Sequence, residues 1–560
     1  MYPKKELAQL VISACRQFQV DTVVISPGSR NAPLTIGFTN HSEIETISLV
    51  DERSAAFFAL GIAQQKQKPV AVLCTSGSAM LNYYPAVAEA FYSNIPLIVL
   101  SADRPKHLID IGDGQTIRQE NVFDKHILFS ANLVENEGLN SQRARLIQKQ
   151  NQQQISEALQ TAISQKGPVH INIPFDEPLY DTVDELNNFE FPTITSSYLD
   201  NNNIDYQKLA KIWKGAEKKM ILVGVSYPNE ELHDLMDTHA DDPSVLILTE
   251  TTSNFHHSKA INSIDQLIFS LTEEEFKDLQ PDILVTFGGM IVSKKIKKFL
   301  RTYQPKHHWN IDEKKAMNTF FCLSEFVQTN PVDFFSKFNP MIDQKNNGYQ
   351  DKWLGLRDDK REKHAEYLQS MPHSDFKAFE QILNSIPNGS KLQISNSAII
   401  RYAQLFTIDP SIETYCNRGT SGIDGSTSTA IGAAYASQKP TVLISGDLSF
   451  FYDSNALWNK HIPKNFRIIL VNNSGGGIFK IIPGPSSTNA EAYFETPHCL
   501  TAKHLAAMHG LDYVSAHTTE LVSNALKDFY APSEKPKILE IFTPSQENDA
   551  ILKSYFKYIE

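Results

Sequence analysis

The sequence predicts an α/β protein of three consecutive domains whose sheets are mainly parallel. Short runs of apolar and β-branched residues recur along the 560 residues, and a segment with helical periodicity follows each run. A chain of this length holds about three to four domains at roughly 150 residues each. The runs fall into three sets that polar stretches separate, which favours three domains.

Composition and charge exclude several classes of protein. Apolar residues make up 41 % of the chain and charged residues 21 %, as in ordinary globular proteins. The 52 Lys and Arg residues against 64 Asp and Glu residues give a net charge of −12, which disfavours nucleic acid as a partner. No apolar run reaches the roughly 20 residues that span a bilayer, and the cysteines form no C-x-x-C pair. We therefore expect a cytoplasmic protein with reduced thiols and no integral membrane segment.

The first set of strand patterns lies within residues 1–183. An amphipathic helix opens the chain, with apolar residues at helical spacing between Leu7 and Phe18. We expect residues 1–183 to form one complete domain and the polar residues 184–205 to form a linker. The strand patterns of this set lie at 22–30, 45–53, 70–78, 95–104 and 168–175.

The second and third sets predict two further domains of the same class. We expect a central domain at 206–342, a polar connector at 343–375 and a last domain at 376–560. The second set of strand patterns lies at 218–226, 244–250, 281–289 and 307–312. The third set lies at 391–397, 412–419, 440–447, 466–473 and 536–542.

Two polar residues directly follow strands of the third set and predict a metal site. Asp447 follows VLISG and Asn473 follows IILVN, one strand–helix–strand crossover apart. Ligands bind beyond the carboxyl ends of parallel strands, and carboxylate and amide oxygens suit Mg²⁺. The glycines at 475–477 would let the backbone approach a phosphate. Either residue alone would be explained by a helix cap or a turn, but together they favour a metal-diphosphate site.

These residues resemble the metal-binding motif of thiamine diphosphate-dependent enzymes, in which Gly-Asp is followed by Asn-Asn. The resemblance implies that Asp447, Asn473 and the carbonyl of Gly475 ligate Mg²⁺, or Mn²⁺ in its place. Leu448 stands where most of the family has glycine, which is typical of the branch that joins 2-oxoglutarate to isochorismate in menaquinone biosynthesis. The resemblance to this branch runs from about residue 20 to residue 490. It is carried by SPGSRNAPLT (26–35), DERSAAFFALGIA (51–63), TSGSA (75–79), SADRP (101–105), GQTIRQ (114–119), NRGTSGIDGSTSTAIGAA (417–434) and GDLSFFYDSNAL (446–457).

The resemblance implies a transferase that uses thiamine diphosphate. Its members decarboxylate 2-oxoglutarate, release CO2 and add the resulting succinic semialdehyde enamine to the ring alkene of isochorismate. This conjugate addition gives 2-succinyl-5-enolpyruvyl-6-hydroxy-3-cyclohexene-1-carboxylate. The resemblance also implies that the first domain binds the pyrimidine of the cofactor and the last its diphosphate. The active sites then lie between subunits of a homodimer or homotetramer.

Glu52 is the catalytic residue that the resemblance implies. A carboxylate at a helix start also stabilises the helix dipole, which is its commoner role. In the family the matching glutamate hydrogen-bonds N1′ of the aminopyrimidine, and the residue matching Ile423 supports the bent cofactor. The implied cofactor-binding residues are Glu52, Ile423, Gly446, Asp447, Leu448, Ser449, Asn473, Gly475, Gly476, Ile478 and Phe479.

The substrates explain why the implied site contains several cations. Each reactant carries two carboxylates, and a guanidinium can bind a carboxylate with two parallel hydrogen bonds. Lys294 lies in SKKIKK, so Lys295, Lys297 and Lys298 stay open as the lysine that contacts substrate. The implied substrate-binding residues are Ser29, Arg30, Arg104, Gln115, Lys294, Ser397, Arg401 and Arg418.

Two other functions compete with this interpretation. Another thiamine diphosphate-dependent decarboxylase or ligase, of the acetohydroxyacid synthase type, would share Glu52, Asp447 and Asn473 without needing the cations. A metabolite sensor that kept the fold would not need Glu52. The histidine pairs at 256–257 and 307–308 lack the spacing of a zinc site and are expected to be structural or exposed.

Overall fold

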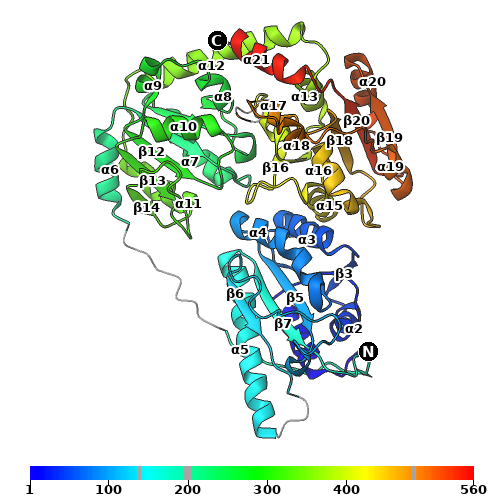
Figure 1. Ribbon diagram of the computed structural model, residues 1–560. Coiled ribbons are helices and arrows are strands. Elements are labelled where there is room, and N and C mark those ends of the chain that lie inside the picture. The colour runs from blue at the N-terminus through cyan, green and yellow to red at the C-terminus, as the bar shows by residue number, and fades with distance from the viewer. Residues whose placement is uncertain (137–140, 194–203, 482–483, 485–486) are drawn as a thin grey trace.

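The protein contains three α/β units, each built on a six-stranded parallel sheet (Figure 1). The computed structural model describes residues 1–136, 141–193, 204–481, 484 and 487–560. The predicted fold class is confirmed. Residues 194–203 of the expected linker at 184–205 lie outside the described residues.

The first unit has the strand order β3-β2-β4-β5-β7-β6. A short antiparallel ribbon of β1 (Tyr2–Pro3) and β8 (Thr182–Val183) joins its two ends. The sheet strands are β2 (Thr22–Ile25), β3 (Glu45–Ser48), β4 (Val70–Cys74), β5 (Leu97–Asp103), β6 (Phe129–Asn132) and β7 (Val169–Pro174). The helices are α1 (Glu6–Gln17), α2 (Ala32–Thr39), α3 (Glu52–Lys66), α4 (Tyr84–Ser93) and α5 (Ser141–Gln165), with 3₁₀ turns η1 (Gly77–Tyr83) and η2 (Lys106–Leu108).

The second unit has the strand order β11-β10-β9-β12-β13-β14. Its strands are β9 (Lys219–Val223), β10 (Val245–Leu248), β11 (Ala260–Ile261), β12 (Ile283–Phe287), β13 (His307–Ile311) and β14 (Glu325–Val327). Its helices are α6 (Tyr206–Gly215), α7 (Glu230–Ala240), α8 (Ile264–Ile268), α9 (Glu273–Leu279), α10 (Lys294–Thr302) and α11 (Pro331–Phe338), with 3₁₀ turns η3 (Thr251–Ser253) and η4 (Asn339–Met341).

The third unit has the strand order β16-β15-β17-β18-β20-β19. Its strands are β15 (Lys391–Ile394), β16 (Glu413–Tyr415), β17 (Thr441–Gly446), β18 (Arg467–Asn472), β19 (Asp512–Ala516) and β20 (Lys537–Phe542). Its helices are α13 (Asp375–Ser385), α14 (Ala398–Ala403), α15 (Ser426–Ala436), α16 (Asp447–Tyr452), α17 (Ile478–Ile481), α18 (Glu491–Glu495), α19 (Lys503–His509), α20 (Thr519–Phe529) and α21 (Asn548–Tyr558), with the 3₁₀ turn η5 (Ser454–Leu457).

A long polar helix, α12 (Tyr349–Gln369), lies in the stretch expected to be a connector. Its Trp353 is buried in the core of the second unit, while Lys360 donates to the carbonyl of Ile559 in the third. The guanidinium of Arg357 donates to the carbonyl of Ala260 at 3.0 Å. The helix therefore packs against both units instead of lying free in solvent.

The central strands are buried along their whole length because helices cover both faces of each sheet. All residues of β4, β9 and β12 are buried, as is typical of parallel sheets. Each unit therefore has apolar cores on both sides of its sheet, and the carboxyl ends of its strands are left to carry polar loops. None of the described helices has the combination of length and hydropathy that a bilayer-spanning helix requires.

Helix α3 of the first unit packs closely against helix α15 of the third unit (Figure 1). A Cβ atom on Gly61 of α3 would lie 2.1 Å from the carbonyl oxygen of Thr429. A Cβ atom on Gly432 of α15 would lie 2.0 Å from the carbonyl oxygen of Phe58. Glycine is therefore needed on both helices for their backbones to touch. This contact places the start of α3 beside the segment that follows Asp447.

Candidate active site

The carboxyl ends of β17 and β18 bring the predicted metal ligands together. These two strands are neighbours in the sheet, with Gly446 paired to Val471. Asp447 is the first residue of α16, and its Oδ1 accepts from the amide of Leu448 at 2.6 Å. The amide of Gly475 donates to Oδ2 of Asp447 at 2.9 Å. The two loops of the motif therefore meet at one carboxylate, as the spacing predicts.

The carboxylate of Asp447 is buried, with 3 % of the residue exposed. Burial raises its pKa to about 7, although hydrogen bonds from the amides of Leu448 and Gly475 act in the opposite direction. Nε2 of His498 lies 3.4 Å from its Oδ2. A buried carboxylate with such a pKa is a group that a cation would stabilise.

Asn473 is oriented by a carboxylate that lies far from it in sequence. Its Nδ2 donates to Oδ2 of Asp375 at 2.9 Å, which leaves the amide oxygen to act as a ligand. Asp375 is itself buried and also accepts from the hydroxyl of Thr543. Gly475 has a φ of 153°, in the region that favours glycine, and a Cβ atom there would lie 2.7 Å from the carbonyl oxygen of Glu495.

The other expected cofactor residues surround this pair of loops. The hydroxyl of Ser449 donates to the carbonyl of Ile423 at 2.7 Å, which joins α16 to the loop before α15. Ile423 is 39 % exposed although it is a large apolar residue. The amide of Gly446 donates to the hydroxyl of Ser395, and Leu448 is half-buried. Gly476 is buried, and Ile478 and Phe479 begin α17.

Glu52 begins α3, directly after the residue that caps this helix. The side chain of Asp51 accepts from the amide of Ser54 at 2.9 Å. Glu52 is half-buried, and burial raises its pKa. Its charge also raises the pKa values of Cys74 and Tyr83, so it lies near the end of β4. The local structure therefore supplies a carboxyl that retains its proton more readily than one in water.

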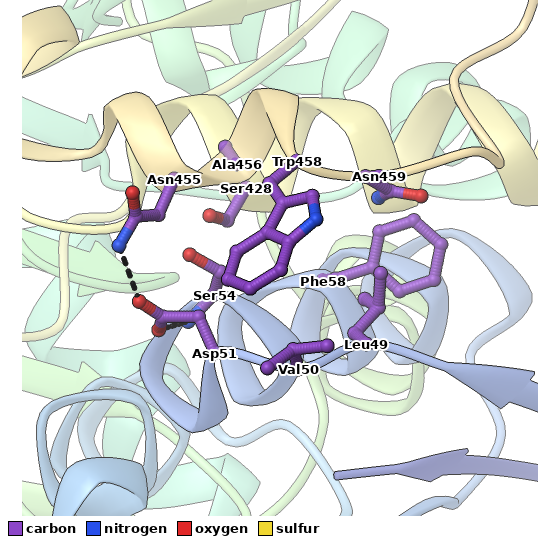
Figure 2. Close-up of a pocket in the computed structure, with 10 residues that line it drawn as sticks. All are labelled: Leu49, Val50, Asp51, Ser54, Phe58, Ser428, Asn455, Ala456, Trp458 and Asn459. Atoms are coloured by element: carbon purple, nitrogen blue, oxygen red, sulfur yellow. Dashed lines mark hydrogen bonds between the residues drawn. The ribbon is translucent and has the colours of Figure 1, made fainter. Parts of the chain in front are cut away.

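Both neighbours of Glu52 bind the segment between Asp447 and Asn473 of the same chain (Figure 2). Asn455 donates to Oδ2 of Asp51 at 2.7 Å, and Figure 2 shows this hydrogen bond beside Trp458 and Val50. The guanidinium of Arg53 donates to the carbonyl of Tyr452 at 2.7 Å and lies 4.6 Å from the centre of its ring.

Arg401 and Arg418 form a pair of cations at the carboxyl end of the third sheet. Burial lowers the pKa of Arg401, and the charge of Arg418 lowers it further. The Nε atoms of both are buried and have no hydrogen-bond partner among the residues that the structure describes. Nη1 of Arg418 donates to Oδ1 of Asn396 at 2.8 Å. Ser397 follows Asn396 with a φ of 67° and begins the turn into α14.

The four lysines near residue 294 lie in different environments on α10. Lys294 is exposed. Lys295 lies 4.4 Å from the ring centre of Phe269, so its ammonium group packs on the helix surface. Lys297 is half-buried, and burial lowers its pKa, while the charges of Glu250, Arg418 and Arg401 act on the same ammonium group. Lys298 is exposed. Among the four, Lys297 is the lysine that the structure places electrostatically near the arginine pair.

The remaining expected substrate residues lie in the first unit. Arg30 is buried and donates to the carbonyl of Phe175 at 2.8 Å. Arg104 donates to the carbonyl of Gly114 at 3.1 Å, which places it beside the exposed Gln115. Ser29 is exposed. The expected set therefore falls into one group on the first unit and another on the second and third units.

Sequence reasoning missed Asp375 and Asn396, and it left Lys297 open as one of three alternatives to Lys294. Asn396 directly precedes Ser397 at a strand end, and this position in the sequence could have marked it as a site residue. Asp375 acts across the fold and gave no signal.

The histidines expected to be structural include His308, which is buried with Nε2 2.9 Å from the hydroxyl of Thr286. Burial raises the pKa of Cys416 to about 12, so this thiol is not a nucleophile at neutral pH.

Comparison with known proteins defines the class of protein. Two family models match, "Thiamine pyrophosphate enzyme, N-terminal TPP binding domain" over residues 5–127 and "Thiamine pyrophosphate enzyme, C-terminal TPP binding domain" over residues 398–541. The fold is similar to the crystal structure of benzoylformate decarboxylase from Polynucleobacter necessarius, with a TM-score of 0.71, 15 % identity, and coverage of 98 % of this chain and 99 % of that chain. Fold and site together define a thiamine diphosphate-dependent enzyme.

Curated relatives identify the family within this class. The chain is 54 % identical over 560 residues to the 2-succinyl-5-enolpyruvyl-6-hydroxy-3-cyclohexene-1-carboxylate synthase of Flavobacterium johnsoniae, covering 100 % of this chain and 99 % of that protein. It is 36 % identical over 570 residues to the synthase of the same name from Porphyromonas gingivalis, covering 100 % and 98 %. The chain belongs to the family of 2-succinyl-5-enolpyruvyl-6-hydroxy-3-cyclohexene-1-carboxylate synthases.

Proposed function

We propose that the protein joins 2-oxoglutarate to isochorismate with loss of CO2, giving 2-succinyl-5-enolpyruvyl-6-hydroxy-3-cyclohexene-1-carboxylate in menaquinone biosynthesis. The observation that carries the proposal is the full-length identity of 54 % to a synthase of that name. The half-buried arginine pair supports it, because a decarboxylase of simple 2-oxoacids has less need of clustered cations. Location in the cytoplasm stays a prediction from the sequence.

The residues at the ends of β17 and β18 fit a divalent cation and a diphosphate. Asp447 would supply a carboxylate oxygen, Asn473 an amide oxygen and Gly475 a carbonyl oxygen to Mg²⁺, or to Mn²⁺ in its place. The raised pKa of the buried Asp447 supports this assignment, since a bound cation would stabilise the ionised carboxylate. When bound, thiamine diphosphate supplies a thiazolium ring that accepts the electron pair released by decarboxylation.

Glu52 would act on the cofactor through its proton. We assign it the hydrogen bond to N1′ of the aminopyrimidine, where it holds a proton that can move between the two atoms. Because burial raises its pKa, Glu52 keeps a larger protonated fraction near neutral pH than an exposed glutamate. Ile423, with 39 % of its surface exposed, is available to support the cofactor from the loop before α15.

The substrate carboxylates would be bound by the cations of two groups. Arg401 and Arg418 carry buried Nε atoms that have no partner in the described part of the chain, and a carboxylate could accept from them in a bidentate manner. Lys297, or Lys294 at the exposed start of α10, would add a third cation. Arg30, Arg104, Ser29 and Gln115 would form the opposite wall, because they lie in the connections that follow β2 and β5 of the first unit.

We propose that the complete site forms between subunits of a homodimer or homotetramer. In a single chain, Asp51 and Arg53 bind the third unit, while Glu52 lies near Cys74 and Tyr83 of its own unit. Large apolar side chains near the site are exposed, such as Tyr452 at 52 % and Trp458 at 57 %. A second subunit would cover such surface.

Substrate selectivity tests the proposal against its alternative. The holoenzyme is given thiamine diphosphate, Mg²⁺ and either 2-oxoglutarate or pyruvate, each with isochorismate present, and isochorismate consumption is followed. We expect consumption with 2-oxoglutarate only. Turnover of pyruvate without use of isochorismate would favour an enzyme of the acetohydroxyacid synthase type.

A further inference from the structure

A buried glutamate of the first unit holds the loop that carries Arg418. Glu89 lies on α4 (Tyr84–Ser93), on the side of the first unit that faces the third (Figure 1). Only 1 % of the residue is exposed. The loop at residues 417–425 contains both Arg418 and Ile423, and none of the chemistry assigned above uses Glu89.

Both carboxylate oxygens of Glu89 accept hydrogen bonds from this loop. The amide of Gly419 donates to Oε1 at 2.7 Å, and the amide of Thr420 donates to Oε2 at 2.6 Å. The hydroxyl of Thr420 donates to Oε2 at 2.9 Å. Ser93, one turn along α4, donates to Oε1 at 2.7 Å. An ionised carboxylate accepts all four bonds, whereas a carboxamide offers one oxygen and would present hydrogens to the other donors.

The position of Gly419 shows how closely the loop approaches α4. A Cβ atom on Gly419 would lie 2.6 Å from the carbonyl oxygen of Glu89 and 3.0 Å from Cδ of its side chain. Any larger residue would push the loop away from the carboxylate. Close contact with Glu89 therefore explains both the glycine and the path of the loop directly after Arg418.

The second half of the loop is held by other groups. Nδ2 of Asn396 donates to the carbonyl of Gly422 at 2.8 Å, and Ser449 donates to the carbonyl of Ile423 at 2.7 Å. Glu89 thus fixes residues 419–420, directly after Arg418, whose guanidinium also donates to Asn396, while Ile423 is held by Ser449. A loss of the Glu89 contacts should move Arg418 more than it moves Ile423.

We propose that Glu89 is a positioning residue that fixes Arg418 for binding a substrate carboxylate. The inference rests on the proposed function, in which Arg418 contacts substrate. The residue that sets the position of Arg418 then belongs to the first unit of the same chain. Substrate affinity then depends on how the first and third units pack, in addition to the residues that touch substrate.

The test combines kinetics with a double-mutant cycle. Glu89→Gln should raise KM for the substrates about tenfold, with thiamine diphosphate affinity by calorimetry within about twofold of wild type. The same substitution in an Arg418→Ala background should have little further effect, because Glu89 acts through Arg418. Ser93→Ala removes a donor that is not on the loop and serves as the matched control, with near-normal kinetics.

Amide hydrogen exchange separates this inference from the proposed function. In Glu89→Gln, the amides of Gly419 and Thr420 should exchange faster than in wild type, whatever reaction the enzyme catalyses. If Glu89→Gln does not fold, Thr420→Val removes one loop donor and is judged by the same measurements. Unchanged exchange, or kinetic effects that add fully to those of Arg418→Ala, would overturn the inference. An inactive wild type with the expected exchange would overturn the proposed function instead.

Discussion

The amide of Gly475 donates to the carboxylate of Asp447 at 2.9 Å. The loops that follow two neighbouring strands therefore meet at one buried carboxylate. Sequence spacing predicts this meeting, since parallel strands carry their loops to the same edge of the sheet. The contact is made between groups of the protein itself, at the ends of β17 and β18. The consequences for binding and catalysis can be tested residue by residue.

Asp447→Asn should weaken the binding of thiamine diphosphate in the presence of Mg²⁺ by about tenfold or more. The substitution keeps the shape of the side chain but removes the negative charge that a divalent cation needs. Calorimetric titration measures the affinity. Asp237→Asn, on an exposed carboxylate of α7, is the charge-matched control. Unchanged affinity in Asp447→Asn would contradict the assignment.

Glu52→Gln should bind the cofactor with near-normal affinity and lose about a hundredfold or more in kcat. A carboxamide can hydrogen-bond to a ring nitrogen but cannot hold and release the proton. Steady-state kinetics with saturating cofactor separates the two effects. Turnover close to that of wild type would remove Glu52 from the proton transfer.

Arg401→Lys should lower kcat/KM by about tenfold or more, although the positive charge is kept. Lysine cannot form the two parallel hydrogen bonds of a guanidinium to a carboxylate. We expect the loss to appear mainly in KM for the substrate whose carboxylate Arg401 binds. A wild-type value of kcat/KM in Arg401→Lys would show that the positive charge alone is sufficient at this position.

Lys297→Ala should lower kcat/KM by about tenfold, and Lys294→Ala should have a smaller effect. Lys297 is half-buried and lies near Arg418 and Arg401, whereas Lys294 is exposed at the start of α10. The ammonium group of Lys297 therefore acts in a less solvated place and contributes more to binding an anion. The opposite order of effects would assign the substrate contact to Lys294.

The stability of the protein should depend on pH through Asp453, which is buried and caps α15 by accepting from the amide of Ser428 at 2.7 Å. Burial raises its pKa from 3.8 to about 7. As the pH rises from about 4 to about 7, the unfolded chain ionises this group more readily than the folded protein. Its contribution to the free energy of unfolding therefore falls across that range.

Asp453→Asn isolates this effect. The free energy of unfolding of wild type relative to the variant should be lower at pH 8 than at pH 5 by about 2 kcal/mol. Urea denaturation at the two pH values measures the difference. An equal difference at both pH values would show that Asp453 keeps an ordinary pKa in the folded protein.

The sequence predicts the fold class and the metal motif because both follow from local patterns. Asp447 and Asn473 stand directly after apolar strand runs, and parallel pairing then brings them together. The catalytic role of Glu52 is predicted by the resemblance alone, because a carboxylate at a helix start more commonly stabilises the helix dipole. Asp375 and Glu89 could not be predicted, since each acts through a contact that depends on how separate parts of the chain pack. The choice among the lysines of α10 depends on the surroundings of each side chain, which the sequence does not show.

The central claim is that decarboxylation and carbon–carbon bond formation are coupled at one site. The most direct measurement counts CO2 released from 2-oxoglutarate against isochorismate consumed, with thiamine diphosphate and Mg²⁺ present and the product identified by mass. The account predicts equal amounts of CO2 released and isochorismate consumed, with 2-succinyl-5-enolpyruvyl-6-hydroxy-3-cyclohexene-1-carboxylate as the product. Release of CO2 while isochorismate stays unconsumed would contradict it.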